Sequence, residues 1–193
     1  SYDSVVYAKH HPCGPKSDFN FRLNAQQRAI EAGFDEVGIG ALMGLNNNDF
    51  GNGIDYDGSG NDFEILALIA HAYNLQEKTG KLPYSLSIPR LQTVEGSCFE
   101  IPQAVDNITY LAYHAILKLA LPQTKLILTR RETPMMFDAL RPLINIEDLA
   151  VRPGVGGNYK QDTHFQNELG DARSTPEIIS DVRAKGYTAL VKG

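Results

Sequence analysis

The fold class of this chain is decided by two adjacent stretches, AVDNITYLAYHAILKLAL (residues 104–121) and KLILTRRE (residues 125–132). The first stretch repeats apolar residues at helical spacing and is stopped by Pro122, so it predicts a helix. The second is a short apolar run, which predicts a buried strand that is apolar on both faces. A helix that leads directly into such a strand is typical of parallel β/α units.

The same alternation continues along the rest of the chain. We expect helices over residues 18–33, 61–80, 135–144 and 175–186, and further strands over 37–45, 84–91 and 148–151. Asp18 is the expected N-cap of the first of these helices, and Gly33 stands where its C′ glycine belongs. Four strands are too few for a complete eight-stranded β/α barrel, which takes about 250 residues. The 193 residues therefore predict a single α/β domain, residues 1–193, which is either half of a barrel or a small open sheet.

Composition and charge exclude several classes of protein. The chain holds 18 Lys and Arg against 23 Asp and Glu, a net charge of −5, which argues against a nucleic-acid partner. It has no apolar run near the ~18 residues that span a membrane, and its first residues lack the features of a signal peptide. The two cysteines, Cys13 and Cys98, lie far apart and favour a reduced, cytoplasmic protein without a self-contained zinc or iron–sulfur site.

Three candidate ligand-binding clusters follow predicted strands, because parallel β/α proteins bind ligands at the carboxyl ends of their strands. The first is Gly38-Ile39-Gly40, where missing side chains would admit a flat ligand or another backbone. Its alternative explanation is tight packing between a helix and the strand. The others are Ser87-Ile88-Pro89-Arg90 and Thr129-Arg130-Arg131-Glu132.

Arginines from the two later clusters could hold one carboxylate-bearing ligand, since a guanidinium group binds a carboxylate through paired hydrogen bonds. The alternative is an ordinary ion pair, such as Arg131 with Glu132 or with Asp148.

The polar loop 46–64 matches the first half of a calcium-binding loop. Its oxygen-bearing candidates at positions 1, 3 and 5 are Asp55, Asp57 and Ser59. The glutamate expected at position 12 is replaced by Leu66, so a surface loop of turn-forming residues is the competing interpretation. The five histidines show no ligand spacing, and no other metal site is predicted.

Four blocks of the sequence resemble one enzyme family, in the same order and over nearly the whole chain. They cover residues 11–45, 85–91, 126–132 and 167–174. Together they resemble the aromatic-amino-acid lyase branch of the radical S-adenosylmethionine (SAM) enzymes. That branch includes the tyrosine lyase of [FeFe]-hydrogenase maturation, 2-iminoacetate synthase of thiamine thiazole synthesis, and a tryptophan lyase. Block 167–174 is most similar to the hydrogenase maturase.

The resemblance implies a radical reaction within half of a TIM-like barrel. In the family, a 4Fe-4S cluster cleaves SAM to a 5′-deoxyadenosyl radical, which abstracts hydrogen from the amino group of an aromatic amino acid. Tyrosine then fragments to p-cresol and dehydroglycine. The implied SAM-binding residues are Arg22, Gly38, Ile39 and Gly40.

The resemblance also implies a substrate pocket. Arg131 matches the arginine that binds the substrate carboxylate, and Ser87 and Arg90 lie in the family's Ser-x-Pro-Arg strand end. Asp148 departs from the family, which tends to have a serine near the substrate at this point. The segment 46–64 is longer than the family's usual connection and is interpreted as an insertion.

The cysteines of the family's cluster, spaced by three and then two residues, have no counterpart here. We therefore expect the C-terminal half of a longer lyase, which associates with an N-terminal half barrel or with itself. The alternative is a complete, non-catalytic binding or assembly module derived from the barrel.

Overall fold

A computed structural model of the chain describes residues 1–46, 60–92, 100–101, 104–148, 171 and 173–191. Its strands are β1 (Gly38–Gly40), β2 (Ser85–Ser87), β3 (Lys125–Leu128) and β4 (Ile146–Glu147). Its helices are α1 (Ser4–His10), α2 (Phe19–Leu23), α3 (Ala25–Glu31), α4 (Gly60–Thr79), α5 (Asn107–Ala120), α6 (Pro134–Leu140) and α7 (Thr175–Ala184). Each helix in this part of the chain is too short or too polar to cross a bilayer.

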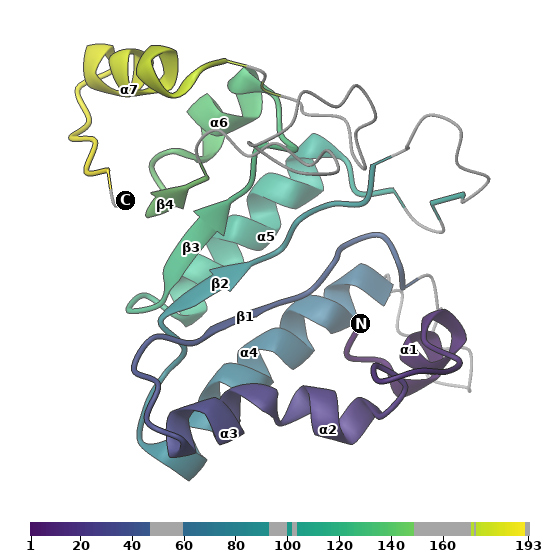
Figure 1. The fold of residues 1–193 in the computed structure, drawn as a ribbon. Coiled ribbons are helices and arrows are strands. Elements are labelled where there is room, and N and C mark those ends of the chain that lie inside the picture. Colours follow the sequence, from purple (N-terminus) through teal and green to yellow (C-terminus); the bar gives the residue numbers. More distant parts are fainter. Residues whose placement is uncertain (47–59, 93–99, 102–103, 149–170, 172, 192–193) are drawn as a thin grey trace.

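The four strands form one parallel sheet in the order β1-β2-β3-β4 (Figure 1). Strand order in space equals strand order along the chain, as in a β/α barrel and unlike a doubly wound sheet, where the order reverses. The predicted parallel α/β architecture is therefore confirmed, and its sequential strand order is that of a barrel segment.

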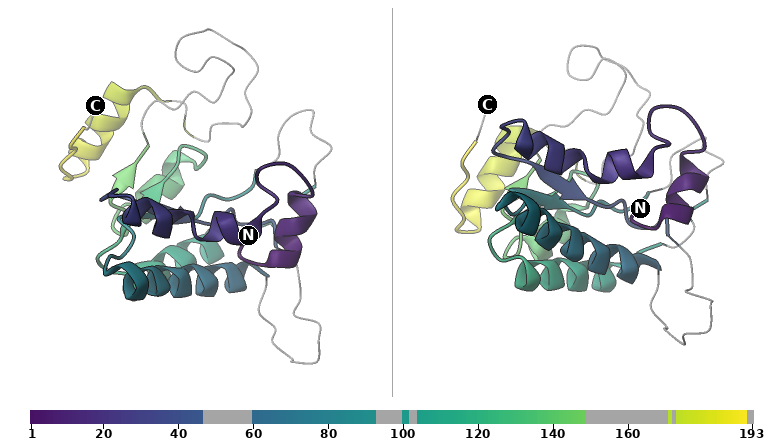
Figure 2. Two further views of the ribbon diagram at one scale, coloured as in Figure 1. Left: turned by 60° about the horizontal axis from the view of Figure 1, so that its bottom comes forward. Right: turned by 90° about the horizontal axis from the view of Figure 1, so that it is seen from below.

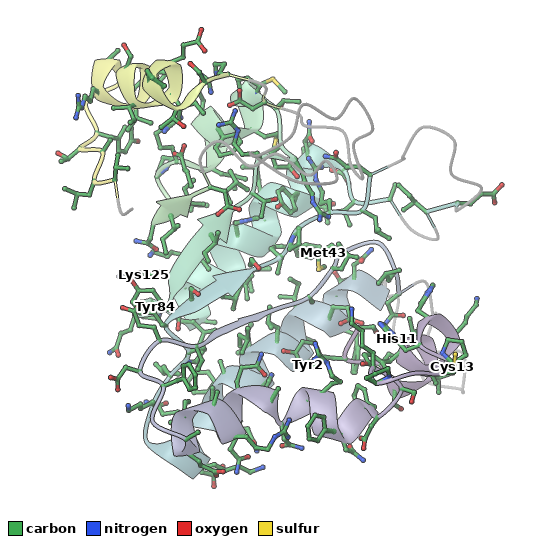
Figure 3. The ribbon with its side chains drawn as sticks, in the orientation of Figure 1. Tyr2, His11, Cys13, Met43, Tyr84 and Lys125 are labelled. Atoms are coloured by element: carbon green, nitrogen blue, oxygen red, sulfur yellow. The ribbon has the colours of Figure 1, made fainter. Side chains whose placement is uncertain are left out.

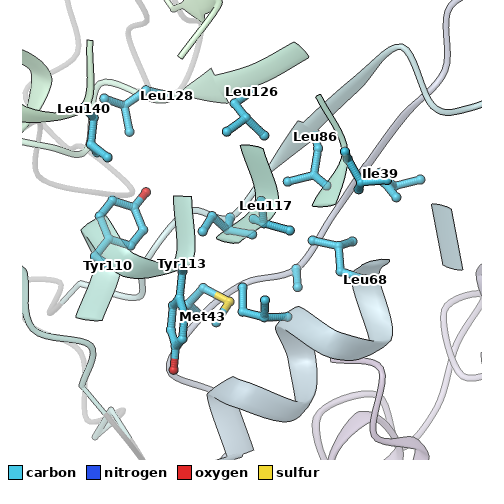
Figure 4. Close-up of a cluster of buried hydrophobic side chains, with 14 of the residues drawn as sticks. Ile39, Met43, Leu68, Leu86, Tyr110, Tyr113, Leu117, Leu126, Leu128 and Leu140 are labelled. Atoms are coloured by element: carbon cyan, nitrogen blue, oxygen red, sulfur yellow. The ribbon is translucent and has the colours of Figure 1, made fainter. Parts of the chain in front are cut away.

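In the described residues, helices α4 and α5 pack against one face of the sheet. Ile39, Leu86 and Leu126 are partners in the register and share this face. They join one buried cluster with side chains of α4 and α5, among them Leu68 and Leu117 (Figure 4). The two helices lie side by side on the same side of the strands (Figures 1 and 2).

The opposite face carries small and polar residues along β1 and β2. There Gly38 and Gly40 of β1 pair with Ser85 and Ser87 of β2. The prediction of strands that are apolar on both faces is wrong for this part of the sheet. Within the described residues, helices cover one face, and the other face has glycine and serine at these positions in place of apolar side chains.

The amino ends of the strands are closed by local contacts. Lys125 donates a hydrogen bond of 2.6 Å to the Tyr84 hydroxyl, and its ammonium group lies 4.0 Å from the centre of the Tyr84 ring. Figure 3 shows this pair well away from His11 and Cys13. In β/α barrels, residues at this edge contribute to stability. A functional site is therefore expected at the carboxyl ends of the strands.

The helix predicted over residues 18–33 is divided into α2 and α3. Asp18 caps it as expected, accepting a hydrogen bond of 2.8 Å from the Phe21 amide, and Gly33 has the expected positive φ of 97°. The break is at Asn24, whose side-chain amide donates to the Asn20 carbonyl at 2.9 Å. Asparagine side chains compete with the backbone for hydrogen bonds, which explains the break.

The last strand lies earlier than the predicted 148–151. Asn145 forms two hydrogen bonds with Leu126, one through its amide at 2.9 Å and one through its side-chain oxygen at 3.2 Å. These contacts start the pairing, so β4 covers Ile146–Glu147. The Asp148 amide extends the pairing by donating to the Leu128 carbonyl at 3.2 Å, and residues 149–151 lie outside the described part.

Candidate functional site

A hollow of about 250 Å³ lies between α1, α2, β1 and α4. Three of the four predicted SAM-binding residues, Arg22, Ile39 and Gly40, are among the residues that line it. His11 and Lys16 add basic groups, and none of the lining residues carries a carboxylate. The hollow therefore favours a ligand with an anionic group.

The glycines of β1 are required by the neighbouring strand. A Cβ atom on Gly40 would lie 2.4 Å from the Ser87 carbonyl oxygen, and one on Gly38 would lie 2.9 Å from the Ser85 hydroxyl. The contact at Gly40 is with backbone, which cannot move aside, whereas the Ser85 hydroxyl near Gly38 can rotate away. Of the explanations that the sequence leaves open, close approach of another backbone therefore accounts for Gly40. Gly38 does not line the hollow.

The wall of the hollow is held by aromatic and polar contacts of the first residues. The Tyr2 hydroxyl shares a hydrogen bond of 2.8 Å with Nδ1 of His71. Burial and the nearby Glu64 carboxylate raise the pKa of Tyr2, and burial lowers the pKa of His71. The Tyr2 amide donates to the buried Glu64 carboxylate at 2.7 Å. Tyr2 and His71 are therefore neutral at physiological pH and shape the hollow without adding charge.

On the other side of the hollow, the rings of Tyr7 and His11 stack with centres 4.2 Å apart. The Tyr7 hydroxyl donates to the Lys16 carbonyl at 2.5 Å. Figure 3 shows Tyr2 and His11 on the side of the molecule where α1 lies. These contacts hold the segment between α1 and α2 in place. Lys16 of this segment and Arg22 of α2 both line the hollow.

Arg90, at the end of β2, is bound by groups within the chain. Its guanidinium group forms a two-point ion pair with the buried carboxylate of Glu132, with Nε donating to Oε1 at 3.0 Å. Nη1 donates to the Val105 carbonyl at 2.9 Å and to Asn107 at 3.0 Å, and the group stacks 4.3 Å above the Tyr110 ring. Every nitrogen of Arg90 therefore has a partner, and the side chain joins β2, β3 and α5.

Arg130 is also bound within the chain. It is buried, and its Nε and Nη2 donate to the Asp171 carbonyl at 3.0 and 2.6 Å. Nη2 also donates to the Arg173 carbonyl at 2.6 Å. Arg130 thus attaches the segment that precedes α7 to the end of β3. Its Nη1 is buried without a hydrogen-bond partner.

Arg131 differs from both neighbours on the sheet edge. It is half-buried, and within the described residues its guanidinium group has no ion-pair partner. The alternative in which Arg131 pairs with Glu132 or Asp148 is not seen in that part of the chain, because Glu132 is occupied by Arg90. Ser87 lies one strand away, on the polar face, where its carbonyl accepts from the Ala41 amide at 3.2 Å. Among the described residues at this edge, Arg131 is therefore the arginine without an ion-pair partner, and it could bind a ligand.

The calcium candidates Asp55, Asp57 and Ser59 lie outside the described residues, so calcium binding stays a prediction. Glu64, the acidic residue nearest to the expected position 12, accepts hydrogen bonds from Tyr2 and from Asn46 at 3.0 Å. Within the described ranges, no three His, Cys, Asp or Glu side chains are placed to hold a metal ion.

Comparisons with known proteins identify the relatives of this chain. It is 28% identical over 194 residues to 2-iminoacetate synthase of Salmonella typhimurium and 31% identical over 195 residues to that of Escherichia coli. Both matches cover the whole chain but 48% of the relative, so the chain spans about half the length of the curated relatives it matches. No family model matches the sequence.

Solved structures agree. A crystal structure of HydG, a maturase of the [FeFe]-hydrogenase, superposes with a TM-score of 0.81 at 33% identity, over 97% of this chain and 38% of that one. HydG from Carboxydothermus hydrogenoformans gives a TM-score of 0.80 at 36% identity, over 97% of this chain and 40% of that one. The chain is homologous to 2-iminoacetate synthase and HydG. These are the radical-SAM tyrosine lyases that the sequence blocks resemble, so the predicted family is confirmed.

A more distant structure supports the fold of this tyrosine-lyase homologue. Methylornithine synthase (PylB) superposes with a TM-score of 0.66 at 16% identity, over 99% of this chain and 50% of that one. Together with the HydG matches, it confirms that the four-stranded sheet corresponds to about half of a radical-SAM barrel.

Two features of the site are not evident from the sequence alone. One is the different roles of the arginines, since Arg130 and Arg131 are equivalent in the sequence until their partners are known. The other is the attachment of Arg130 to Asp171, which lies 41 residues further along the chain. The alternation of side chains along a strand partly predicts the role of Arg90. Arg90 follows the buried Leu86 and Ile88 at a spacing of two residues, so it is expected on the same buried face.

Proposed function

We propose that this chain is the C-terminal half of a radical-SAM lyase that cleaves tyrosine or a similar aromatic amino acid, in hydrogenase cofactor maturation or thiazole synthesis. One observation carries the proposal: Arg22, Ile39 and Gly40 line one hollow at the sheet, in a chain whose whole length matches tyrosine lyases. Residues that are separated along the sequence but assigned to one cofactor thus lie around one space.

The hollow fits the proposed cofactor in shape and charge. Ile39 and Gly40 line the hollow, so the backbone of β1 around Ile39 can face the adenine of SAM. Arg22 and Lys16 supply positive charge for the carboxylate of SAM. When bound next to a reduced iron–sulfur cluster, SAM supplies the radical that takes hydrogen from the substrate.

The substrate is proposed to lie over the polar face at the carboxyl ends of β2 and β3. Arg131 is half-buried and free of ion pairs in the described part, so it can bind the substrate carboxylate through two hydrogen bonds. Ser87 is proposed to line the same space, and Arg90 to support it by holding Glu132 and the start of α5 in place.

The residues of this chain do not fit the iron–sulfur cluster. The family uses three closely spaced cysteines, and the sequence holds two, Cys13 and Cys98, at distant positions. We propose that another half barrel supplies the cluster ligands and pairs with the sheet edges at β1 and β4, each of which has one neighbour in the described sheet. We also propose a cytoplasmic location, where cluster cysteines remain reduced.

Arg22→Ala and Arg131→Ala separate the two proposed sites. The test uses the protein as the cell produces it, reconstituted with iron and sulfide and supplied with SAM, tyrosine and a reductant. We expect 5′-deoxyadenosine and p-cresol as products. Arg131→Ala should weaken tyrosine binding roughly 10- to 100-fold and leave SAM binding near normal, because a charged hydrogen-bond pair contributes about 1.5–3 kcal/mol. Arg22→Ala should do the reverse.

The matched control is Arg183→Ala, which removes an exposed arginine of α7 and should change neither affinity. Unchanged tyrosine turnover in Arg131→Ala would contradict the assignment of Arg131. No 5′-deoxyadenosine from the wild-type protein would contradict the proposed function.

Intact mass distinguishes this proposal from a non-catalytic module. A cellular protein about twice as long as the 193 residues would carry the missing half. A cellular protein of 193 residues could not hold the cluster by itself, and the binding-module alternative would then replace the proposal.

A further inference from the structure

Helix α5 is apolar on both of its faces. Its inward face packs in the core, where Tyr110 and Leu117 are buried. Lys118 is the single Lys, Arg, Asp or Glu among its 14 residues. A surface helix normally carries charged residues on its outward face, and a helix that is apolar all round is normally buried on all sides. The outward face of α5 is therefore unlike a surface that evolved to face water.

Four apolar residues form a stripe along this outward face. Ile108, Ala112, Ala115 and Leu119 follow one another at intervals of four, three and four residues, which is the spacing of a coiled-coil contact. Ile108 and Leu119, at the two ends of this α5 stripe, are 81% and 83% exposed. In the described part of the chain, α4 and α5 are the outer layer on this side of the sheet (Figure 2).

Helix α4 enlarges the apolar surface beside the α5 stripe. Leu66 and Tyr73 of α4 are exposed, and so is Ile116 of α5. The Tyr73 hydroxyl donates a hydrogen bond of 2.7 Å to the Ala120 carbonyl, which joins the two helices near the carboxyl end of α5. Soluble monomers rarely expose adjoining apolar side chains of this number and size, and such patches mark interaction surfaces.

The α5 stripe is complementary to itself. Its large residues stand at the ends and its alanines in the middle, so the order of sizes is the same in both directions. In an antiparallel pair of α5 helices, Ile108 of one copy meets Leu119 of the other, and the central alanines let the two backbones approach closely. The stripe carries no charge, so a two-fold axis brings no like charges together although the chain has a net charge of −5.

The size of the surface indicates a weak dimer. The 14 residues of α5 span about 21 Å, and two helices packed side by side are together about 20 Å wide. The resulting face of roughly 400 Å² is about half of the roughly 800 Å² that each copy contributes to a standard interface. We therefore expect reversible association, with a dissociation constant of roughly 10–100 µM.

We propose that the outward faces of α4 and α5 bind a second copy of this chain, with the two α5 stripes packed antiparallel. The inference is independent of the proposed function. The surface also differs from the sheet edges at β1 and β4, where another half barrel is proposed to pair.

Sedimentation velocity over a concentration series tests the inference on the protein as the cell produces it. Wild-type protein should change reversibly from monomer to dimer. Ile108→Glu and Leu119→Lys each place a charge in the apolar contact and should weaken dimerisation by about tenfold or more. Both residues are exposed in the single chain, and an acid near the start and a base near the end of a helix suit its dipole. Both variants should therefore fold normally, which circular dichroism checks.

The double variant I108E/L119K tests the antiparallel arrangement. The two positions are about 16 Å apart along one helix, so the introduced charges cannot pair within one copy. Across the proposed interface, each introduced glutamate faces an introduced lysine of the other copy. Dimerisation of the double variant should therefore exceed that of either single variant. Val5→Lys is the matched control, because Val5 is an exposed apolar residue of α1, and it should leave dimerisation unchanged.

A protein that stays monomeric well above the expected dissociation constant would overturn the inference. Association that both single variants leave intact would also overturn it and would assign the contact to another surface, such as the sheet edges. Loss in both single variants without recovery in the double variant would contradict the antiparallel packing. Because the measurement needs neither SAM nor tyrosine, failure of the proposed function would leave this result unaffected.

Discussion

Single residues at the carboxyl edge of the sheet have distinct tasks despite similar chemistry. Arg90 binds the Glu132 carboxylate, and Arg130 binds the Asp171 carbonyl. Both side chains therefore connect elements of the fold. Arg131 keeps its donors available in the described part of the chain. A guanidinium group that is saturated by internal partners stabilises the fold, and one that is free can bind a ligand. The roles therefore depend on partners and not on residue type.

Gly40→Ala should destabilise the protein by about 1–3 kcal/mol, because the new methyl group would overlap a backbone atom, the Ser87 carbonyl oxygen at 2.4 Å. Gly38→Ala is the matched control. Its nearest neighbour at 2.9 Å is the Ser85 hydroxyl, a side chain that can rotate away. Urea denaturation of both variants measures the difference, and equal losses would contradict the argument.

His114 should make the protein sensitive to mild acid. Burial lowers its pKa to about 4, against the raising effect of the hydrogen bond that its Nδ1 donates to Tyr110, and Arg90 lowers it further. The folded state thus holds His114 neutral below pH 6.5, where the unfolded chain takes up a proton. Stability from this group is complete above pH 6.5 and falls as pH drops towards 4, with about 2 kcal/mol lost at pH 5.

The change in free energy of unfolding between pH 7 and pH 5 checks this, measured for wild type and for His114→Gln. The variant should lose less stability over that interval, because it has no group to protonate at this position. An identical pH dependence in the two proteins would show that His114 does not contribute.

At the scale of elements, buried charged side chains join strands to helices. The pair of Arg90 and Glu132 connects β2, β3 and the start of α5. Arg130, Asp171 and Arg173 connect β3 to α7, where Arg173 also pairs with Asp181 at 3.1 Å. Both connections lie at the carboxyl edge, so they fix the positions of the residues that would contact ligands.

Glu132→Gln should destabilise the protein by about 2–4 kcal/mol, because it leaves the mostly buried Arg90 guanidinium without its counter-charge. Asp35→Asn breaks the exposed pair with Lys81 and should have no measurable effect on stability. Chemical denaturation compares the two variants, and a loss in Glu132→Gln no larger than that in Asp35→Asn would refute the structural role of the pair.

Arg130→Met should loosen α7 selectively. The substitution keeps an apolar stem but removes the donors to the Asp171 and Arg173 carbonyls. Amide hydrogen exchange should therefore accelerate in residues 173–186 and stay unchanged in α4 and α5. Arg183→Met, on the exposed surface of α7, serves as the control. Uniform acceleration throughout the chain would indicate general destabilisation and count against the specific connection.

At the scale of the whole molecule, the described sheet is open at both edges. Its strands follow chain order, helices cover one face, and β1 and β4 each pair with a single strand in the described sheet. Exposed strand edges tend to pair with other strands. The 193-residue chain purified alone should therefore associate in a concentration-dependent way, as measured by sedimentation velocity. A stable monomer at all concentrations would contradict this prediction.

The sequence by itself determined the parallel α/β class, the approximate positions of the helices and strands that follow α1, and the family. These depend on local signals: Asp18 as a cap, Pro122 as a stop, and apolar runs such as that of residues 125–128. The tertiary structure alone decided the break at Asn24, the early start of β4 at Asn145, and which arginine stays free. The reason is physical: periodicity and capping act between near neighbours in the chain, whereas Arg90 and Arg130 acquire their roles from partners on other strands and helices.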